Sequence, residues 1–370
     1  MPFWPSPARA RHVGCSVVPS DTVDHALLRH HGDVDARPGM LDFAVNVQGS
    51  APPPWLRARL AARLDDLGRY PSAADHDAAR AAVATRHGRL ADEVLLLSGA
   101  AEGFALLPRL TPRLAALVHP SFTEPELALR EAGIPVTRVL LDSPYALDPA
   151  AVPETADLVV LGNPTNPTSV LHPARAIRAL RRPGRVIVVD EAFMDAIPGE
   201  PESLAGTAGP DILVLRSLTK TWALAGLRCG YFLGDPALLD RLAHGRPHWP
   251  LGTLPLEAIR ATATPDALAE ADARAHTLAI RRARMIERLA ALDVEVHTPA
   301  AGPFLLLRVP AGEAVRARLG EQGIAVRRAD TFPGLGADHL RVAVRGDAEV
   351  DLLIAGLRTA MRLSAPGLRG

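Results

Sequence analysis

Short apolar runs separated by amphipathic stretches dominate residues 94–233, and this alternation most constrains the fold. We predict buried strands at Val94–Leu97, Ala115–Val118, Val136–Leu140, Leu158–Leu161, Val186–Val189, Ile212–Leu215 and Tyr231–Leu233. We expect the helices between them to begin near Glu102, Glu124, Pro173 and Ala223. Strands that alternate with helices predict an α/β fold with a doubly wound, mostly parallel sheet. Sheets of this kind bind ligands at the carboxyl ends of their strands.

The pattern changes after Gly234, where longer helical stretches and short strands replace the alternation. We expect a helix over 268–292, strands at 294–297, 304–309, 324–327 and 340–344, a helix near Val315 and a last helix over 350–363. This order is typical of a smaller α+β domain. We therefore predict a disordered tail at residues 1–24, an N-terminal arm at 25–50, a large domain at 51–247 and a small C-terminal domain at 248–370.

The charge and composition of the chain argue against several classes of partner. The formal net charge is zero and the sequence has no basic run, so we expect no binding to nucleic acid. No apolar run is long enough to cross a bilayer, so we expect no membrane partner. Two cysteines, Cys15 and Cys229, are too few for a disulfide framework and fit a cytoplasmic location. We assign no metal ligands.

Lys220 is the single lysine of the chain, whereas 40 arginines supply the other basic side chains. A lysine amine with a lowered pKa can form a Schiff base with a carbonyl, which a guanidinium cannot do. The alternative explanation is that one lysine survives by chance in an arginine-rich composition, and its uniqueness alone does not separate the two. The predicted strand at 212–215 delivers Lys220 to an edge of the sheet.

The neighbours of Lys220 favour a chemical role. Ser217 and Thr219 precede it and Arg228 follows it, and hydroxyls with a guanidinium are suited to hold a phosphate. A phosphate beside a Schiff-base lysine indicates the cofactor pyridoxal phosphate (PLP). A P-loop also combines lysine with phosphate, but the sequence contains no Gly-x-x-x-x-Gly-Lys motif. We therefore expect PLP and a small-molecule substrate.

Loops after four predicted strands carry further candidate residues. Ala100 and Ala101 begin a helix, where backbone N–H groups can bind a phosphate. Phe122 follows the next strand and could stack on a flat ring, Asn166 follows a third, and Asp190 ends a fourth. Taken singly, each has an ordinary explanation, such as a small-residue turn, a core phenylalanine or a helix cap. Their order along the chain, completed by the lysine, favours one shared site.

In this order the residues resemble the fold-type I PLP enzymes of the class I/II aminotransferase family, over roughly residues 40–362. The resemblance implies that Lys220 is the Schiff-base lysine and Asp190 the partner of the pyridine nitrogen. It also implies that Asn166 donates to the ring 3-oxygen and that Phe122 stacks on the ring. The phosphate-binding residues implied by the resemblance are Ala100, Ala101, Ser217, Thr219 and Arg228.

The same resemblance implies a homodimer with shared active sites, in which Tyr70 reaches the phosphate bound to the other subunit. Arg327 and Arg341 match arginines that bind the anionic groups of the substrate, whereas Arg328 and Arg345 are less well placed alternatives. Such arginines orient the substrate and thereby determine which bond of its Cα breaks. A buried carboxylate beside the ring nitrogen favours the protonated, electron-withdrawing form of the cofactor.

Two branches of the family are nearest. Residues 223–230 resemble histidinol-phosphate aminotransferases, whereas residues 190–193, 216–220 and 340–345 resemble the threonine-phosphate decarboxylases of cobalamin biosynthesis. Phe193 stands where many aminotransferases place a tyrosine. We expect an aminotransferase acting on a small phosphorylated amino acid or amine, with decarboxylation as the alternative. A non-catalytic PLP-binding regulator is a remote alternative, because no helix-turn-helix precedes the domain.

Overall fold

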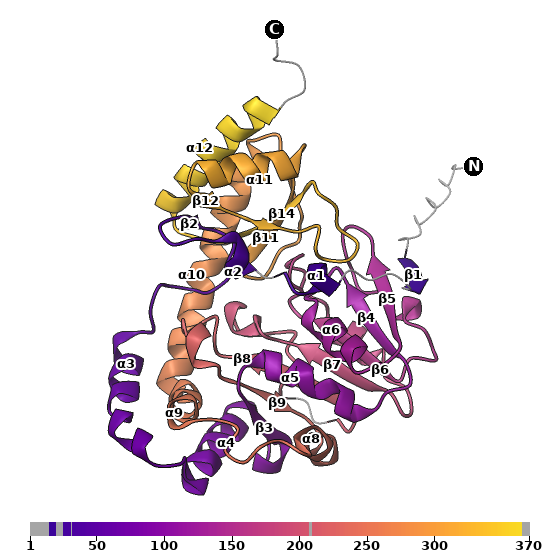
Figure 1. Cartoon of the computed structure of the whole chain (residues 1–370), viewed down its shortest axis with the longest axis vertical. Helices are drawn as coiled ribbons and strands as arrows, with labels where there is room; N and C mark the ends of the chain where they lie inside the picture. Colours follow the sequence, from indigo (N-terminus) through magenta and orange to yellow (C-terminus); the bar gives the residue numbers. More distant parts are fainter. Residues whose placement is uncertain (1–14, 20–24, 31, 207–208, 365–370) are drawn as a thin grey trace, which may run out of the picture.

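The computed structural model describes residues 15–19, 25–30, 32–206 and 209–364. Its largest element is an eight-stranded sheet in the order β1-β5-β4-β6-β7-β8-β9-β3 (Figure 1). Strands β5, β4, β6, β7 and β8 are parallel, whereas β1 is antiparallel to β5, and β9 is antiparallel to both β8 and β3. The strands are β1 (Cys15–Pro19), β3 (Val94–Leu97), β4 (Ala115–His119), β5 (Val136–Leu141), β6 (Leu158–Gly162), β7 (Val186–Asp190), β8 (Ile212–Ser217) and β9 (Gly230–Leu233).

Both faces of this sheet are buried, as the continuous apolar runs predict. In β6, Val159 and Leu161 belong to one hydrophobic core, and Leu158 and Val160 belong to the core on the opposite face. The first core includes residues of α3 (Pro54–Ala61), α4 (Ala73–His87), α7 (Ala174–Arg178) and α9 (Thr253–Thr262), and the second includes residues of α5 (Ala100–Leu106), α6 (Glu124–Glu131) and α8 (Pro236–Ala243). Helices on both faces confirm the predicted doubly wound α/β fold.

A smaller antiparallel sheet forms the second part of the molecule, in the order β10-β11-β14-β13. Its elements are β10 (Glu295–Val296), β11 (Phe304–Arg308), β13 (Arg327–Arg328) and β14 (His339–Ala343), with α11 (Gly312–Glu321) and α12 (Asp347–Ser364) packed on it. Helix α10 (Pro265–Ala290) joins the two parts, with Ala271 in the core of the large sheet and Leu289 in that of the small one (Figure 1). No described helix combines the length and apolarity needed to span a membrane.

The N-terminal arm contacts both parts of the molecule, and it meets the large domain first, where the carbonyl of Leu28 accepts the Thr123 hydroxyl at 2.7 Å. It contains α1 (His25–Leu28), α2 (Gly32–Asp35) and β2 (Leu41–Asp42), and β2 pairs in parallel with β12 (Ile324–Ala325). Phe43 follows β2 and is fully buried in the small-domain core. The arm therefore brings residues 44–48 to the space between the two sheets.

The predicted disordered tail is in part a strand. Cys15–Pro19 forms β1 and pairs with β5, whose edge it covers. Two valines favour an extended conformation, and an uncovered edge strand leaves backbone hydrogen-bonding groups unpaired. The remaining residues of the predicted tail lie outside the described residues.

The prediction of a helix that begins near Ala223 is wrong. The segment forms one 3-10 turn, η6 (Ala225–Leu227), because Ala223 and Arg228 adopt left-handed backbone angles, with φ of 53° and 57°. The strand expected at 324–327 divides into β12 and β13, which pair with different sheets. Helix α3 ends at Ala61, and the chain then forms a short 3-10 helix, η1 (Leu64–Gly68).

The packing of α9 bears on the predicted boundary at residue 247. This helix follows the boundary, yet its Leu256 and Ile259 share a core with Ala79 and Val83 of α4. The first half of α10 belongs to the same core. Packing therefore favours a division inside α10 rather than near residue 247.

Two glycines of α11 provide a test of how the small domain packs. A Cβ on Gly312 would lie 2.8 Å from the carbonyl oxygen of Ala337, whereas Gly320 has no such neighbour among the described residues. Gly312→Ala should lower the free energy of unfolding by about 1–3 kcal/mol because backbone must move. Gly320→Ala should raise it by up to about 1 kcal/mol through helix propensity. Urea denaturation measures both, and equal effects would contradict this packing.

Candidate active site

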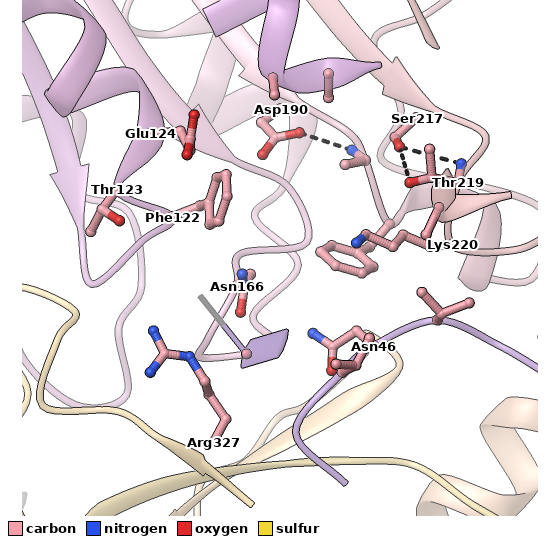
Figure 2. Close-up of a pocket in the computed structure, with 18 of the residues that line it drawn as sticks. Asn46, Phe122, Thr123, Glu124, Asn166, Asp190, Ser217, Thr219, Lys220 and Arg327 are labelled. Atoms are coloured by element: carbon pink, nitrogen blue, oxygen red, sulfur yellow. Dashed lines mark hydrogen bonds between the residues drawn. The ribbon is translucent and has the colours of Figure 1, made fainter. Parts of the chain in front are cut away.

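A cavity of about 450 Å³ lies between the carboxyl ends of the parallel strands and the small domain. Figure 2 shows side chains from the large sheet, the small domain and the arm around this opening. The predicted site residues that line it are Ala100, Ala101, Phe122, Asn166, Asp190, Ser217, Thr219, Lys220, Arg228, Arg327 and Arg341. Those of the large domain meet because successive parallel strands end on the same edge of the sheet, whereas Arg327 and Arg341 come from β13 and β14 of the small sheet.

One corner of the cavity is built from hydroxyls and a guanidinium. The Ser217 and Thr219 hydroxyl oxygens lie 2.8 Å apart, and Arg228 donates from Nη1 to the carbonyl of Ala225 at 3.1 Å. The Arg228 guanidinium lies over Gly99, where a Cβ would stand only 2.6 Å from Nη2. Gly99 also has a φ of +81°, so the turn before α5 requires glycine for both reasons. The corner is suited to an anion.

Asp190 and Lys220 come from neighbouring strand ends and face the same space (Figure 2). Burial raises the pKa of the Asp190 carboxyl to about 6, against the opposing effects of the Ala192 N–H, which donates to it at 3.0 Å, and of the Lys220 charge. The carbonyl of Lys220 accepts the N–H of Gln48 at 2.9 Å, so the arm contacts the backbone of this lysine. A buried carboxylate of this kind favours a cationic partner in the cavity.

Two buried arginines form the opposite end. Arg341 donates from Nη1 to Oδ1 of Asn166 at 2.6 Å and from Nη2 to the carbonyl of Ala44, while its Nε has no partner among the described residues. Burial lowers the pKa of Arg341 to about 9, and the charge of Arg327 adds to this effect. Its hydrogen-bond acceptors are neutral, so this end of the cavity carries a charge that an anion would stabilise.

Arg327 is held more tightly by the protein than Arg341. It donates from Nη2 to Thr331 Oγ1 at 2.8 Å and to the carbonyl of His30 at 2.7 Å, and Asp35 lies 3.4 Å from Nη1. Burial lowers its pKa to about 10, and Asp35 opposes this shift. Arg327 still lines the cavity beside Arg341.

Tyr70 does not line this cavity in its own chain. Its side chain is 76% exposed and stacks on Trp249, with ring centroids 4.3 Å apart and an interplanar angle of 23°. An exposed aromatic pair is unusual on a surface that nothing covers. The predicted contact of Tyr70 with a partner subunit's cofactor stays a prediction.

Sequence reasoning missed Asn46, which lines the cavity opposite Lys220 (Figure 2). Asn46 is only 4% exposed, and its Oδ1 is buried without a hydrogen-bond partner in the described part of the chain. A buried amide oxygen of this kind is costly unless a bound molecule satisfies it. An asparagine inside the apolar segment 43–47 was the available signal. His30, Glu124 and Phe193 also line the cavity.

Asp190 should make the stability of the cofactor-free protein depend on pH. Because its pKa is raised in the folded state, ionising it opposes folding, and this cost grows from about pH 4 and is complete above about pH 6. Asp190→Asn should therefore raise the free energy of unfolding by about 1–3 kcal/mol at pH 8 and change it little at pH 4. Urea denaturation at both pH values measures this, and a pH-independent difference would contradict the assignment.

Comparison with known proteins places this geometry in a family. Residues 38–357 match the family Aminotransferase class I and II. A histidinol-phosphate aminotransferase of Mycobacterium bovis is 56% identical over 342 residues, which are 92% of this chain and 93% of that protein. A threonine-phosphate decarboxylase of Salmonella typhimurium is 32% identical over 88% of this chain and 93% of that protein.

A solved structure shares the fold. The histidinol-phosphate aminotransferase of Sinorhizobium meliloti in complex with pyridoxal-5'-phosphate aligns with a TM-score of 0.76 and 23% identity, over 87% of this chain and 90% of that one. The family match includes every predicted site residue, from Tyr70 to Arg341. The chain belongs to the class I and II aminotransferase family.

Proposed function

We propose that this protein is a PLP-dependent aminotransferase whose amino donor is a small phosphorylated amine, with histidinol phosphate as the first candidate. The observation that carries the proposal is a single cavity with Lys220 and Asp190 at one end and Arg341 and Arg327 at the other. The 56% identical relative is named for histidinol phosphate, which supports this choice of substrate.

The residues present fit the cofactor. Arg228, Ser217 and Thr219, with the N–H groups of Ala100 and Ala101, would hold the phosphate at the corner that requires Gly99. Phe122 would lie against the face of the ring, and Asp190 and Asn166 would contact the polar atoms at its edge. Burial raises the pKa of the Asp190 carboxyl, so a neighbouring cation would stabilise its ionised form. A protonated ring nitrogen would be such a cation.

Pyridoxal phosphate, when bound, withdraws electrons from the Cα of an attached amino compound and so acidifies its C–H bond. The chain's own residues supply the rest of the chemistry. The Lys220 amine moves a proton at the substrate Cα, which an arginine at this position could not do. Asp190 holds a proton at the ring nitrogen. The arm and the small domain form part of the cavity wall and so limit the access of water.

The cationic end of the cavity supports a phosphorylated substrate. The phosphate of the cofactor would occupy the corner near Arg228, which leaves Arg341 and Arg327 for an anion of the substrate. Both guanidiniums are at least 95% buried, and Arg341 offers an unsatisfied Nε. A phosphate monoester supplies enough acceptor oxygens to bind both guanidinium groups.

Threonine-phosphate decarboxylation is the second candidate. The 32% identical relative carries that name, and threonine phosphate would present the same kind of phosphate to Arg341. Phe193 lines the cavity and packs edge-on against Phe304, with centroids 5.0 Å apart, so it brings no hydroxyl to the ring. The two reactions differ in the bond that is aligned for cleavage, and therefore in the product.

The test is a product assay with the purified, PLP-loaded enzyme. Histidinol phosphate with 2-oxoglutarate should yield glutamate, and threonine phosphate should yield no carbon dioxide. Lys220→Arg keeps the charge and should abolish turnover, while Arg341→Ala should lower kcat/KM by about ten- to a hundred-fold without altering the absorbance of the cofactor. Carbon dioxide without glutamate would establish the second candidate, and neither product would refute both.

We also propose that the protein is a homodimer with shared active sites, in which the exposed Tyr70 reaches the partner subunit's cofactor phosphate. The support is the stack of Tyr70 on Trp249, both of which are exposed in the single chain, as are Leu64 and Leu67, which precede Tyr70 in the sequence. Apolar side chains exposed to this extent favour a protein interface.

Mixing two variants tests the shared site. Tyr70→Ala and Lys220→Ala should each be weakly active or inactive when pure. In a mixed dimer, one site combines the intact Lys220 of one subunit with the intact Tyr70 of the other, so activity should return after joint refolding. Mixtures that stay as inactive as their components would show that each chain completes its own site. A Trp249→Ala variant mixed with Lys220→Ala serves as the interface control.

A further inference from the structure

Arg345 shares the strand-end segment of Arg341, but its side chain turns to the N-terminal arm. Its Nε donates to the carbonyl of Asp42 at 3.0 Å, and its Nη2 and Nη1 donate to the carbonyls of Val45 and Val47 at 2.6 and 3.3 Å. The described residues that line the cavity do not include Arg345. We propose that Arg345 is a positioning residue that shapes the active-site wall by holding the arm.

The held segment, residues 42–48, is itself part of the cavity wall. Ala44, Val45, Asn46 and Val47 all line the cavity. The side chain of Asp42 fixes the same turn from inside, because its Oδ1 accepts the N–H groups of Ala44 at 2.7 Å and Val45 at 2.9 Å. The N–H groups bond to Asp42 while the carbonyls bond to Arg345, so both sides of the turn's backbone are satisfied.

The two ends of this segment are tied to different parts of the molecule. At the small-domain end, Phe43 donates its N–H to the carbonyl of Ala325 at 2.8 Å and accepts the N–H of Ala343 at 2.8 Å. At the other end, the N–H of Gln48 donates to the carbonyl of Lys220 at 2.9 Å. A change in the arm therefore reaches the backbone of Lys220 and the side chain of Asn46 together.

The planar guanidinium is what this position requires. The three carbonyls that it binds in the arm all belong to the segment 42–47. A planar guanidinium with five N–H donors can reach all of them. A lysine ammonium is a single point charge and cannot span the same oxygens. The charged groups that face Arg345 are Asp42, Glu349 and Arg341, and burial lowers the pKa of the guanidinium. Holding the arm, and not binding an anion, thus accounts for its contacts.

Arg185 provides a matched control. It is a buried arginine that donates to four backbone carbonyls, those of Ala156 at 2.8 Å, Leu180 at 2.9 Å, Pro153 at 2.7 Å and Glu154 at 3.2 Å. It does not appear among the residues described as lining the cavity. Loss of Arg185 should therefore cost stability of a similar kind without any effect on the arm.

The experiment compares Arg345→Gln, Arg345→Lys and Arg185→Gln as PLP-loaded enzymes. Hydrogen exchange should speed up at the Phe43, Ala44, Val45 and Gln48 amides in both Arg345 variants and stay unchanged in the Arg185 variant. Rates with histidinol phosphate and 2-oxoglutarate should show KM raised by about tenfold or more in both Arg345 variants, with a smaller change in kcat. The pH titration of the bound cofactor's absorbance should shift in the same two variants alone.

The kinetic part rests on the proposed function, whereas the exchange and absorbance measurements do not. A wild-type enzyme that turns over neither phosphorylated substrate would refute the proposed function and leave those two measurements to decide the role of Arg345. Normal KM in Arg345→Lys would show that only charge matters and overturn the proposal. Unchanged arm exchange in both variants, or a faster exchange with unchanged KM and absorbance titration, would overturn it as well.

Discussion

A buried ion-pair network around Arg216 joins the two strands on which the active site depends. Arg216 lies in β8 directly before Ser217, and its Nη1 is 3.2 Å from the carboxylate of Glu191, the residue that follows Asp190. Its Nη2 contacts Asp195 at 3.2 Å and also pairs with Glu200. These carboxylates raise the pKa of Arg216 well above its usual value despite its burial. Breaking such a network costs about 3–5 kcal/mol, so the network fixes Asp190 and Lys220 relative to each other.

Arginine side chains serve different purposes in and around the active site. Arg216 is compensated by acidic partners and has no charge to offer a ligand. Arg341 is bonded to neutral oxygens, so its charge stays available and burial lowers its pKa. Arg345 uses its guanidinium only as a set of donors for backbone. The partners, and not the residue type, separate a structural arginine from a binding one.

Sequence alone predicted the large sheet and the residues at its strand ends. Strands that alternate with helices along the chain become parallel strands, and the carboxyl ends of parallel strands lie at one edge of the sheet. Asp190 and Asn166 could be placed together on that basis before any contact was known. The arm could not, since the position of Asn46 and the target of Arg345 depend on pairing between β2 and β12, which are far apart in sequence. The turn at Ala223 was mistaken for a helix because left-handed angles at non-glycine residues leave little trace in composition. The surroundings of Tyr70 depend on contacts that a single chain does not contain.

The single lysine, at the cavity wall, gives the protein an unusual pattern of reactivity toward reagents that modify amines. Apart from the α-amino group of the chain, Lys220 is the one primary amine in the sequence, and it lines the same cavity as Asp190 and Phe122. Amine-directed coupling reagents therefore have no exterior side chain to modify, and a lysine-specific protease has a single peptide bond to cut. Acylation at that amine would report directly on whether the cavity is open, which makes ordinary bioconjugation a probe of its accessibility.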